Sequence, residues 1–195
     1  MNKFDYSHAG LTRLAVTIVA VAMCLYHIWV IVAGQPEAII FRGTHLLFAL
    51  VLAFLIYGPK VGDQRPIPSA IDYAWLALGA ASLLYLFVNY EYVVTRIYYI
   101  DALSLADMIF ATILLVVVTE ATRRAVDVSL PITSLLFIIY GLFIAKLEPM
   151  RMLDQLYMTT EGVFGQALAV SASFVIIFVV FGSFMERTGI GQLFM

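Results

Sequence analysis

The sequence predicts an all-α integral membrane protein with about six transmembrane helices joined by short loops. Hydrophobic residues make up 63% of the chain and charged residues only 12%, and the mean hydropathy of +0.99 lies outside the range of soluble domains. The length of 195 residues accommodates six helices of about 20 residues each. The net charge of −2 argues against nucleic acid as a partner and against a polybasic lipid-binding role, because neither phosphates nor anionic headgroups would be attracted overall. Membrane lipid is expected as the surroundings of the helices.

The first two apolar stretches differ in how clearly they end. Leu14–Ala33 contains no charged residue and is long enough to cross a bilayer. It lacks a small-residue cleavage site, so we expect a retained helix rather than a signal peptide. The second stretch, Leu46–Tyr57, reaches spanning length only if residues 43–45 join it, with Arg42 extending outward to the membrane surface.

A third helix is expected over Ala70–Val88, after a polar linker that begins with a Gly-Pro pair. Its Ala77 and Ala81 are four residues apart, a spacing that lets another membrane helix pack closely. Five tyrosines then surround three charged residues, a mixture typical of the membrane–water boundary. They are Tyr85, Tyr90, Tyr92, Tyr98 and Tyr99, with Glu91, Arg96 and Asp101.

Three further spans follow along the chain. The fourth is expected over Leu103–Thr119, the fifth over Val128–Ala145 and the sixth over Val163–Met185. Pro131 falls in the first turn of the fifth helix, where its missing N–H is tolerated.

The distribution of lysine and arginine predicts that the N-terminus is cytoplasmic, because basic residues gather in cytoplasmic loops. With that orientation seven basic residues face the cytoplasm and four face the other side. The cytoplasmic ones are Lys3, Arg13, Lys60, Arg65, Arg123, Arg124 and Arg187, and the others are Arg42, Arg96, Lys146 and Arg151.

Charged residues within a membrane helix are candidates for function, and for each one we compare a structural role with a functional role. Asp72 and Asp107 each lie near the start of a predicted helix, where a carboxylate caps free N–H groups; coupling to an ion or proton is the alternative role. Glu120 precedes Arg123 and Arg124 by three and four positions, which predicts ion pairs on one helix face. That cluster would hold the end of the fourth helix against a neighbour, and a substrate-anion site is the alternative.

Two histidines and two serines are the remaining polar candidates in apolar stretches. His27 and His45 would lie in adjacent helices, where two imidazoles could ligate a haem. Ser171 and Ser173 alternate with alanines and are expected to form a close-packing face with interhelical hydrogen bonds. No nucleophile elbow, HExxH motif or phosphate-binding glycine loop is present, so the sequence predicts no enzyme activity and no catalytic, metal or cofactor-binding residue.

Three stretches together resemble the TRAP transporters, specifically the fused membrane subunits that work with TAXI-type periplasmic binding proteins. They are VVVTEATRRAVDVSLPI (Val116–Ile132), YMTTEGVFGQALAVSAS (Tyr157–Ser173) and FGSFMERTGIGQLF (Phe181–Phe194). The resemblance implies that residues 1–126 are similar to the four-helix small subunit, a scaffold. Residues 127–195 would then be the first two helices of the twelve-helix large transport subunit.

The resemblance also implies a function in a bacterial or archaeal inner membrane. The family imports an organic acid anion in symport with sodium, and a soluble periplasmic protein delivers that substrate. We expect the chain to be an N-terminal fragment that continues past Met195 into the remainder of the large subunit, where the sodium and substrate sites would lie. No transport-site residue is therefore assigned within these 195 residues.

Two other functions remain open from the sequence. The chain could be a haem-linked or quinone-linked membrane anchor that uses His27 and His45. It could also be a complete small membrane protein with a structural role.

Overall fold

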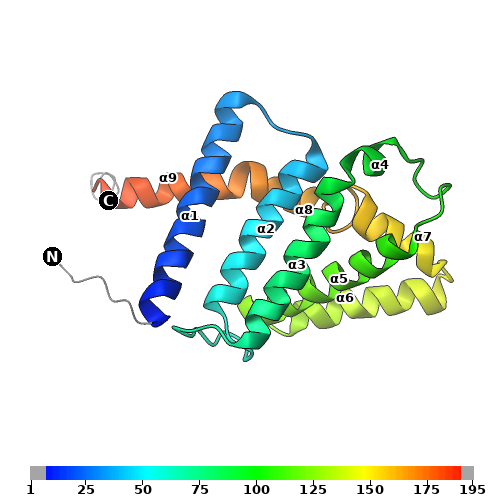
Figure 1. Cartoon of the computed structure of the whole chain (residues 1–195), viewed down its shortest axis with the longest axis horizontal. Helices are drawn as coiled ribbons and strands as arrows, with labels where there is room; N and C mark the ends of the chain where they lie inside the picture. The colour runs from blue at the N-terminus through cyan, green and yellow to red at the C-terminus, as the bar shows by residue number, and fades with distance from the viewer. Residues whose placement is uncertain (1–7, 190–195) are drawn as a thin grey trace.

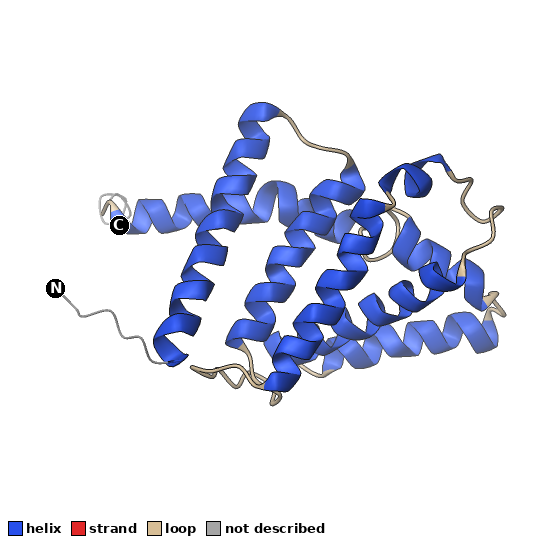
Figure 2. Ribbon diagram, in the orientation of Figure 1, coloured by secondary structure: helices blue, strands red, loops and turns tan. Residues whose placement is uncertain are grey.

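The computed structural model describes residues 8–189, which contain helices and loops and no β-strand (Figures 1 and 2). The predicted charges Lys3 and Asp5 and the end of the chain at Gly191–Met195 lie outside the described residues. The segments, with η marking a π-helix, are α1 (His8–Ala33), α2 (Ala38–Ile56), α3 (Ala70–Val88), α4 (Tyr90–Thr95), α5 (Leu105–Ala125), α6 (Ser129–Ile139), η1 (Tyr140–Ile144), α7 (Pro149–Leu153), η2 (Asp154–Met158), α8 (Gln166–Val170), η3 (Ser171–Val175) and α9 (Ile176–Arg187).

The predicted fold class, an all-α membrane protein, is confirmed. Five helices in the described part are long and apolar enough to span a bilayer: Ala9–Ala33, Ala38–Ile56, Ala70–Val88, Leu105–Ala125 and Gln166–Arg187. The predicted fifth span forms a shorter apolar helix, Ser129–Ile144. Its 11 residues of α6 and 5 of η1 extend about 24 Å at ~1.5 Å per residue, less than the ~30 Å hydrocarbon core.

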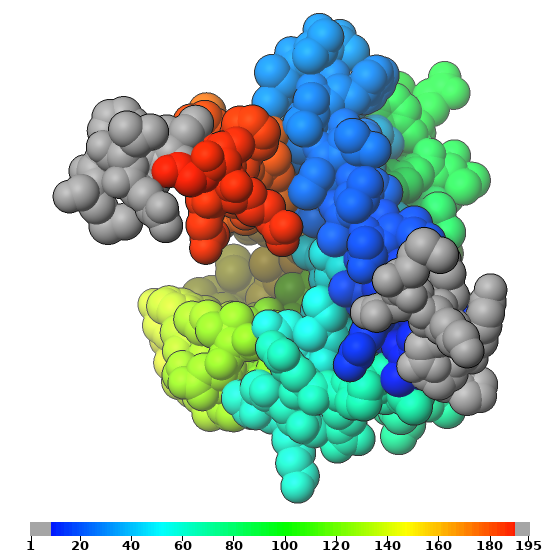
Figure 3. Space-filling model, turned by 90° about the vertical axis from the view of Figure 1, so that its left-hand side faces the viewer, coloured from blue at the N-terminus to red at the C-terminus, as the bar shows by residue number. Residues whose placement is uncertain are grey.

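The helices form a row with two crossing members. Helices α1, α2 and α3 lie side by side in chain order, and α5 packs against both α2 and α3. Helix α6, like the continuous segment α8–η3–α9, runs across this row (Figure 1). In Figure 3, α9 and α6 stand apart with a hollow between them.

The main core lies between α2, α3 and α5, and Tyr157, Met158 and Phe164 complete it from the later part of the chain. Gly79 permits the close approach of α3, because a Cβ there would lie 3.0 Å from Val117 and 3.2 Å from Leu50. The prediction that Ala77 and Ala81 form the close contact is wrong, since both are exposed. The helix instead turns the face that bears Gly79 toward its neighbours.

The predicted start of the second helix at Leu46 is also wrong, because α2 begins at Ala38. Glu37 caps it by accepting hydrogen bonds from the backbone N–H groups of Ile39 (2.8 Å) and Ile40 (3.4 Å). Arg42 does not extend outward as expected. Its Nη1 donates to the carbonyl of Phe164 at 2.6 Å, so the charge is accommodated within the fold.

The start of the last long helix differs from the expected Val163. The chain forms a loop over residues 159–165 and α8 begins at Gln166. Gly162 is required in this loop, because a Cβ there would come within 2.3 Å of the Leu156 Cα. The loop therefore folds back on η2 and inserts Phe164 into the core.

Candidate functional site

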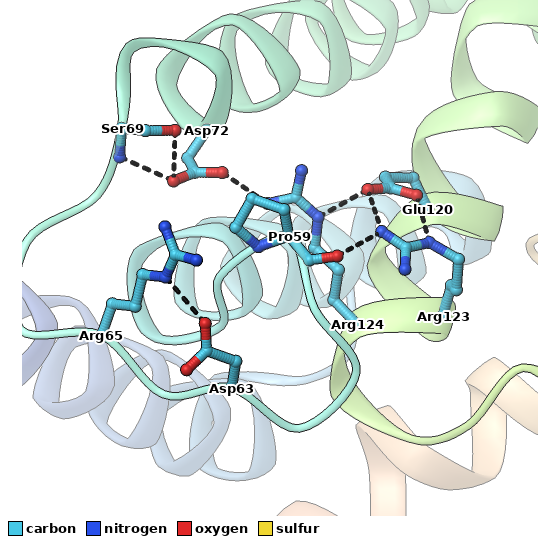
Figure 4. Close-up of polar contacts among 8 residues, drawn as sticks. All are labelled: Pro59, Asp63, Arg65, Ser69, Asp72, Glu120, Arg123 and Arg124. Atoms are coloured by element: carbon cyan, nitrogen blue, oxygen red, sulfur yellow. Dashed lines mark hydrogen bonds and ion pairs between the residues drawn. The ribbon is translucent and has the colours of Figure 1, made fainter.

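Buried and half-buried charges gather at one end of the helix row, which we call the Arg124 end (Figure 4). Glu120 binds both arginines predicted for it: its carboxylate accepts two bonds of 2.8 Å from Arg123 and one of 2.6 Å from Arg124. Arg123 also donates to the carbonyl of Pro59 at 2.7 Å. The predicted role of this cluster, holding the end of the fourth span against a neighbour, is thereby confirmed.

The strongest tie at this end joins two helices through fully buried charges. Arg124 Nη1 pairs with Asp72 Oδ1 at 2.5 Å, and both side chains are at most 2% exposed. Asp72 Oδ2 accepts from the backbone N (2.6 Å) and Oγ (2.9 Å) of Ser69, which confirms the predicted cap of α3. The Arg124 partner was missed, although the alternation of spans places the start of the third and the end of the fourth on the same side.

A second ion pair lies at the opposite end, which we call the Arg96 end. Arg96 Nη1 pairs with Asp154 of η2, and both side chains are nearly inaccessible to solvent. Arg96 Nη2 donates to the Asp101 carbonyl at 2.6 Å, and Asp154 accepts from the backbone N of Tyr99 at 2.9 Å. Asp154 was not singled out in the sequence, because it stands in a short segment without the features of a membrane span.

Asp107 is buried in a cage of donors without a direct ion-pair partner among the described residues. It accepts from Tyr85 at 2.7 Å, from Tyr92 at 3.0 Å and from the backbone N of Ser104 at 2.8 Å. The predicted cap is confirmed, and two of the tyrosines assigned to the membrane boundary act as its hydrogen-bond donors. Burial and the bond to Asp107 raise the pKa of Tyr92, which keeps the phenol protonated as a donor.

His27 and His45 lie in adjacent helices, as predicted, and they contact each other in a chain of hydrogen bonds that continues to Ser171. His27 Nδ1 lies 2.7 Å from the Met23 carbonyl, and its Nε2 lies 2.9 Å from His45 Nδ1. His45 Nε2 lies 3.1 Å from Ser171 Oγ. Ring nitrogens in direct contact leave no space for a macrocycle between them, so this geometry does not fit a haem ligated by both histidines.

Further contacts attach the later part of the chain to the earlier part. Tyr157 donates to the Ser82 carbonyl at 2.6 Å, and burial raises the pKa of this phenol, so that it remains a donor. Gln35, in the loop between α1 and α2, donates to Ser173 at 3.3 Å, so the predicted interhelical hydrogen bond is confirmed for Ser171 and not for Ser173. No group of three or more His, Cys, Asp or Glu between residues 8 and 189 could hold a metal ion.

The arrangement of these groups is suited to fastening helices together. Every buried carboxylate described above is paired with an arginine or accepts several hydrogen bonds. The basic residues Arg65, Arg123 and Arg124 meet at one end, as the orientation prediction requires. Which side of the membrane that end faces stays a prediction.

Comparison with known proteins identifies one family. Residues 113–195 match the family model of the tripartite ATP-independent periplasmic transporter, DctM component. No curated protein and no solved structure matches the chain. The resemblance to TRAP transporters is confirmed for that part of the chain, which is similar to the permease component of a TRAP-type transporter. The match begins within α5, before the boundary predicted at residue 126.

Proposed function

We propose that this chain is the N-terminal scaffold part of a TRAP-type permease that imports an organic acid anion with sodium. A periplasmic TAXI-type protein delivers the substrate. Residues 1–126 act as the small-subunit-like scaffold, and residues 127–195 begin the large transport subunit. The permease resides in the inner membrane of a bacterium or archaeon.

The observation that carries this proposal is the set of buried and half-buried polar contacts that join the two regions. A scaffold has to resist displacement while a transport domain moves. Buried polar contacts between helices resist such displacement, because breaking one leaves an unpaired polar group. Arg96–Asp154, Arg42 with the Phe164 carbonyl and Tyr157 with the Ser82 carbonyl all connect residues before 126 with residues after 127. In line with the resemblance to the family, we assign the sodium and substrate sites to the remainder of the large subunit.

The exposed faces of the later helices support the same assignment. Phe137 of α6 and Phe178 of α9 are each 71% exposed, and the helices α6 and α9 flank the hollow of Figure 3. Such apolar surface suits contact with lipid or with further transmembrane helices. We assign part of it to the remainder of the large subunit.

The test uses the full-length permease and its binding protein in proteoliposomes. We expect accumulation of an organic acid anion only with an inward sodium gradient, and loss of accumulation when potassium replaces sodium. Uptake that is unchanged without sodium would contradict the coupling. A quinone-linked anchor or a small structural membrane protein, the alternatives left open, would show no uptake under either condition.

The scaffold role itself is tested with Asp107→Asn in the same permease. Because Asp107 is a cap in a cage of donors, we expect unchanged KM for substrate and an unchanged sodium concentration for half-maximal uptake. Reduced yield and a lower maximal rate are the expected defects. A several-fold shift in sodium dependence would instead make this carboxylate part of the coupling site.

A further inference from the structure

We propose that the cleft between α1 and α2 at the Arg124 end binds the headgroup of an anionic phospholipid. The cleft has a volume of about 640 Å³ and is open on one side. Its walls come from α1, from the end of α2 and from the connection to α3. The lining residues are Thr12, Arg13, Val16, Thr17, Leu55, Ile56, Gln64, Arg65 and Pro66.

The cleft results from the way α1 meets its neighbour. Near the Arg96 end α1 is fastened, since His27 and Val30 are each 1% exposed and Val30 packs with Phe41. Toward the N-terminus of α1, Leu14 and Ile18 are 47% and 58% exposed. The opening lies between this part of α1 and the end of α2, two membrane-spanning helices.

The chemistry of the walls changes along the depth of the cleft. Arg13 and Arg65 supply two positive charges at the mouth. Arg65 uses only its Nε, on Asp63 at 2.8 Å, so both of its Nη groups have no protein hydrogen-bond partner in the described structure. Guanidinium groups bind phosphate oxygens through paired N–H donors.

The apolar residues Val16, Leu55 and Ile56 are less exposed than the two arginines. Val16 on α1 faces the same space as Leu55 and Ile56 on α2. Within a membrane such a space is filled by acyl chains, because apolar walls give water no hydrogen bonds. A basic mouth above an apolar wedge matches an amphiphile with an anionic phosphate headgroup. Free phosphate would use the mouth alone.

The charge of the cleft also selects among lipids. Asp63 offsets one of the two arginines, so the site carries a net charge near +1 and favours a lipid with a net negative charge. A zwitterionic headgroup would bring its own cation into the basic mouth. Phosphatidylglycerol is the simplest probe of this chemistry.

The experiment measures lipid binding by native mass spectrometry on the full-length permease, delipidated and titrated with phosphatidylglycerol or with phosphatidylcholine of the same acyl chains. We expect one tightly held phosphatidylglycerol, and the double variant Arg13→Gln/Arg65→Gln to bind it about tenfold more weakly. Lys60→Gln is the matched control. It removes a charge from an exposed residue of the same connection that does not line the cleft, and binding should match wild type.

A second variant separates loss of the cleft from loss of charge. Val16→Phe keeps both arginines and fills the apolar wedge, so it should also weaken phosphatidylglycerol binding. Equal binding by the double variant and Lys60→Gln, or equal affinity for phosphatidylcholine, would overturn the proposal. Displacement of the lipid by millimolar inorganic phosphate would overturn it in favour of a free anion. These readouts involve no transport, so their failure is distinct from failure of the proposed function.

Discussion

Arg123 and Arg124 are neighbours in the sequence, but their side chains differ in how far they are buried within the protein. The side chain of Arg123 is 32% exposed and that of Arg124 only 2%. Arg124 is also the sole arginine partner of Asp72 among the described residues. A half-exposed ion pair contributes little to stability, whereas a buried carboxylate that loses its partner is strongly destabilising.

We therefore predict that Arg124→Gln lowers the stability of the purified protein by about 3–5 kcal/mol, and that Arg123→Gln lowers it by about 1 kcal/mol or less. Thermal unfolding in detergent measures both, with the two variants as mutual controls. Adding Asp72→Asn to Arg124→Gln should restore part of the loss, because it removes the unpaired buried charge. Similar melting temperatures for the two single variants would contradict this account.

The histidine chain has a defined direction. The Met23 carbonyl can only accept, so His27 carries its proton on Nδ1 and offers Nε2 as acceptor to His45. By the same logic His45 Nε2 accepts from the hydroxyl of Ser171. No carboxylate bonds to either ring in the described structure, which leaves both rings neutral. Both histidines are therefore predicted to be Nδ1–H tautomers.

Nitrogen chemical shifts of labelled histidine in solid-state NMR should report this tautomer at both positions. Replacing His45 adds a stability test: His45→Phe leaves the buried His27 Nε2 without its partner and should cost about 1–3 kcal/mol. His45→Asn keeps an N–H donor near the position of Nδ1 and should be milder. An Nε2–H tautomer on His27 would contradict the assigned direction.

At the scale of elements, helix caps and ion pairs within one helical turn could be predicted from the sequence. Asp72 and Asp107 cap their helices, and Glu120 pairs with its own turn, because these contacts connect residues a few positions apart. The partners Arg96–Asp154 and Arg42 with the Phe164 carbonyl are 58 and 122 positions apart. Such contacts depend on how helices cross, which periodicity does not encode.

The π-helical turns could not be predicted from the sequence either. Segments η1, η2 and η3 each continue an α-helix, and they contain no proline and no pair of glycines that would indicate a change of helix type. π-Helical turns occur mainly as local insertions that packing stabilises. The position of Ser171 at the start of η3, against His45, is one such packing contact.

The attachment of η2 to the α4 region yields a prediction for this element. Arg96→Gln and Asp154→Asn should each speed hydrogen exchange over residues 154–165, because each leaves a buried partner unpaired. The double variant should be less disturbed than the sum of the two, which a double-mutant cycle measures. Arg151→Gln is the control, since its pair with Glu148 is about 60% exposed. Equal effects of Arg151→Gln and Arg96→Gln would contradict the role of the buried pair.

At the scale of the whole molecule, the two predicted regions share one hydrophobic core. Tyr157 and Phe164, from the region assigned to the large subunit, are fully buried among side chains of α2, α3 and α5. Helix α9 also packs on α1. Separating the regions would expose these aromatic side chains and break the buried Arg96–Asp154 pair. Residues up to the end of α9 should therefore move as one body.

This rigidity gives the last prediction. The background is the full-length permease with its native cysteines, including Cys24, replaced by alanine. Gln35→Cys and Ser173→Cys then introduce one thiol in the loop after α1 and one in η3. In the wild-type protein the side chains of Gln35 and Ser173 are 3.3 Å apart. Bridging them with a short bismaleimide should leave sodium-driven uptake unchanged, since the two positions keep their distance during transport. Each single-cysteine variant treated with the same reagent controls for simple modification. Loss of uptake only in the bridged protein would show that α8–η3–α9 moves against α1, and that the rigid scaffold ends before residue 166.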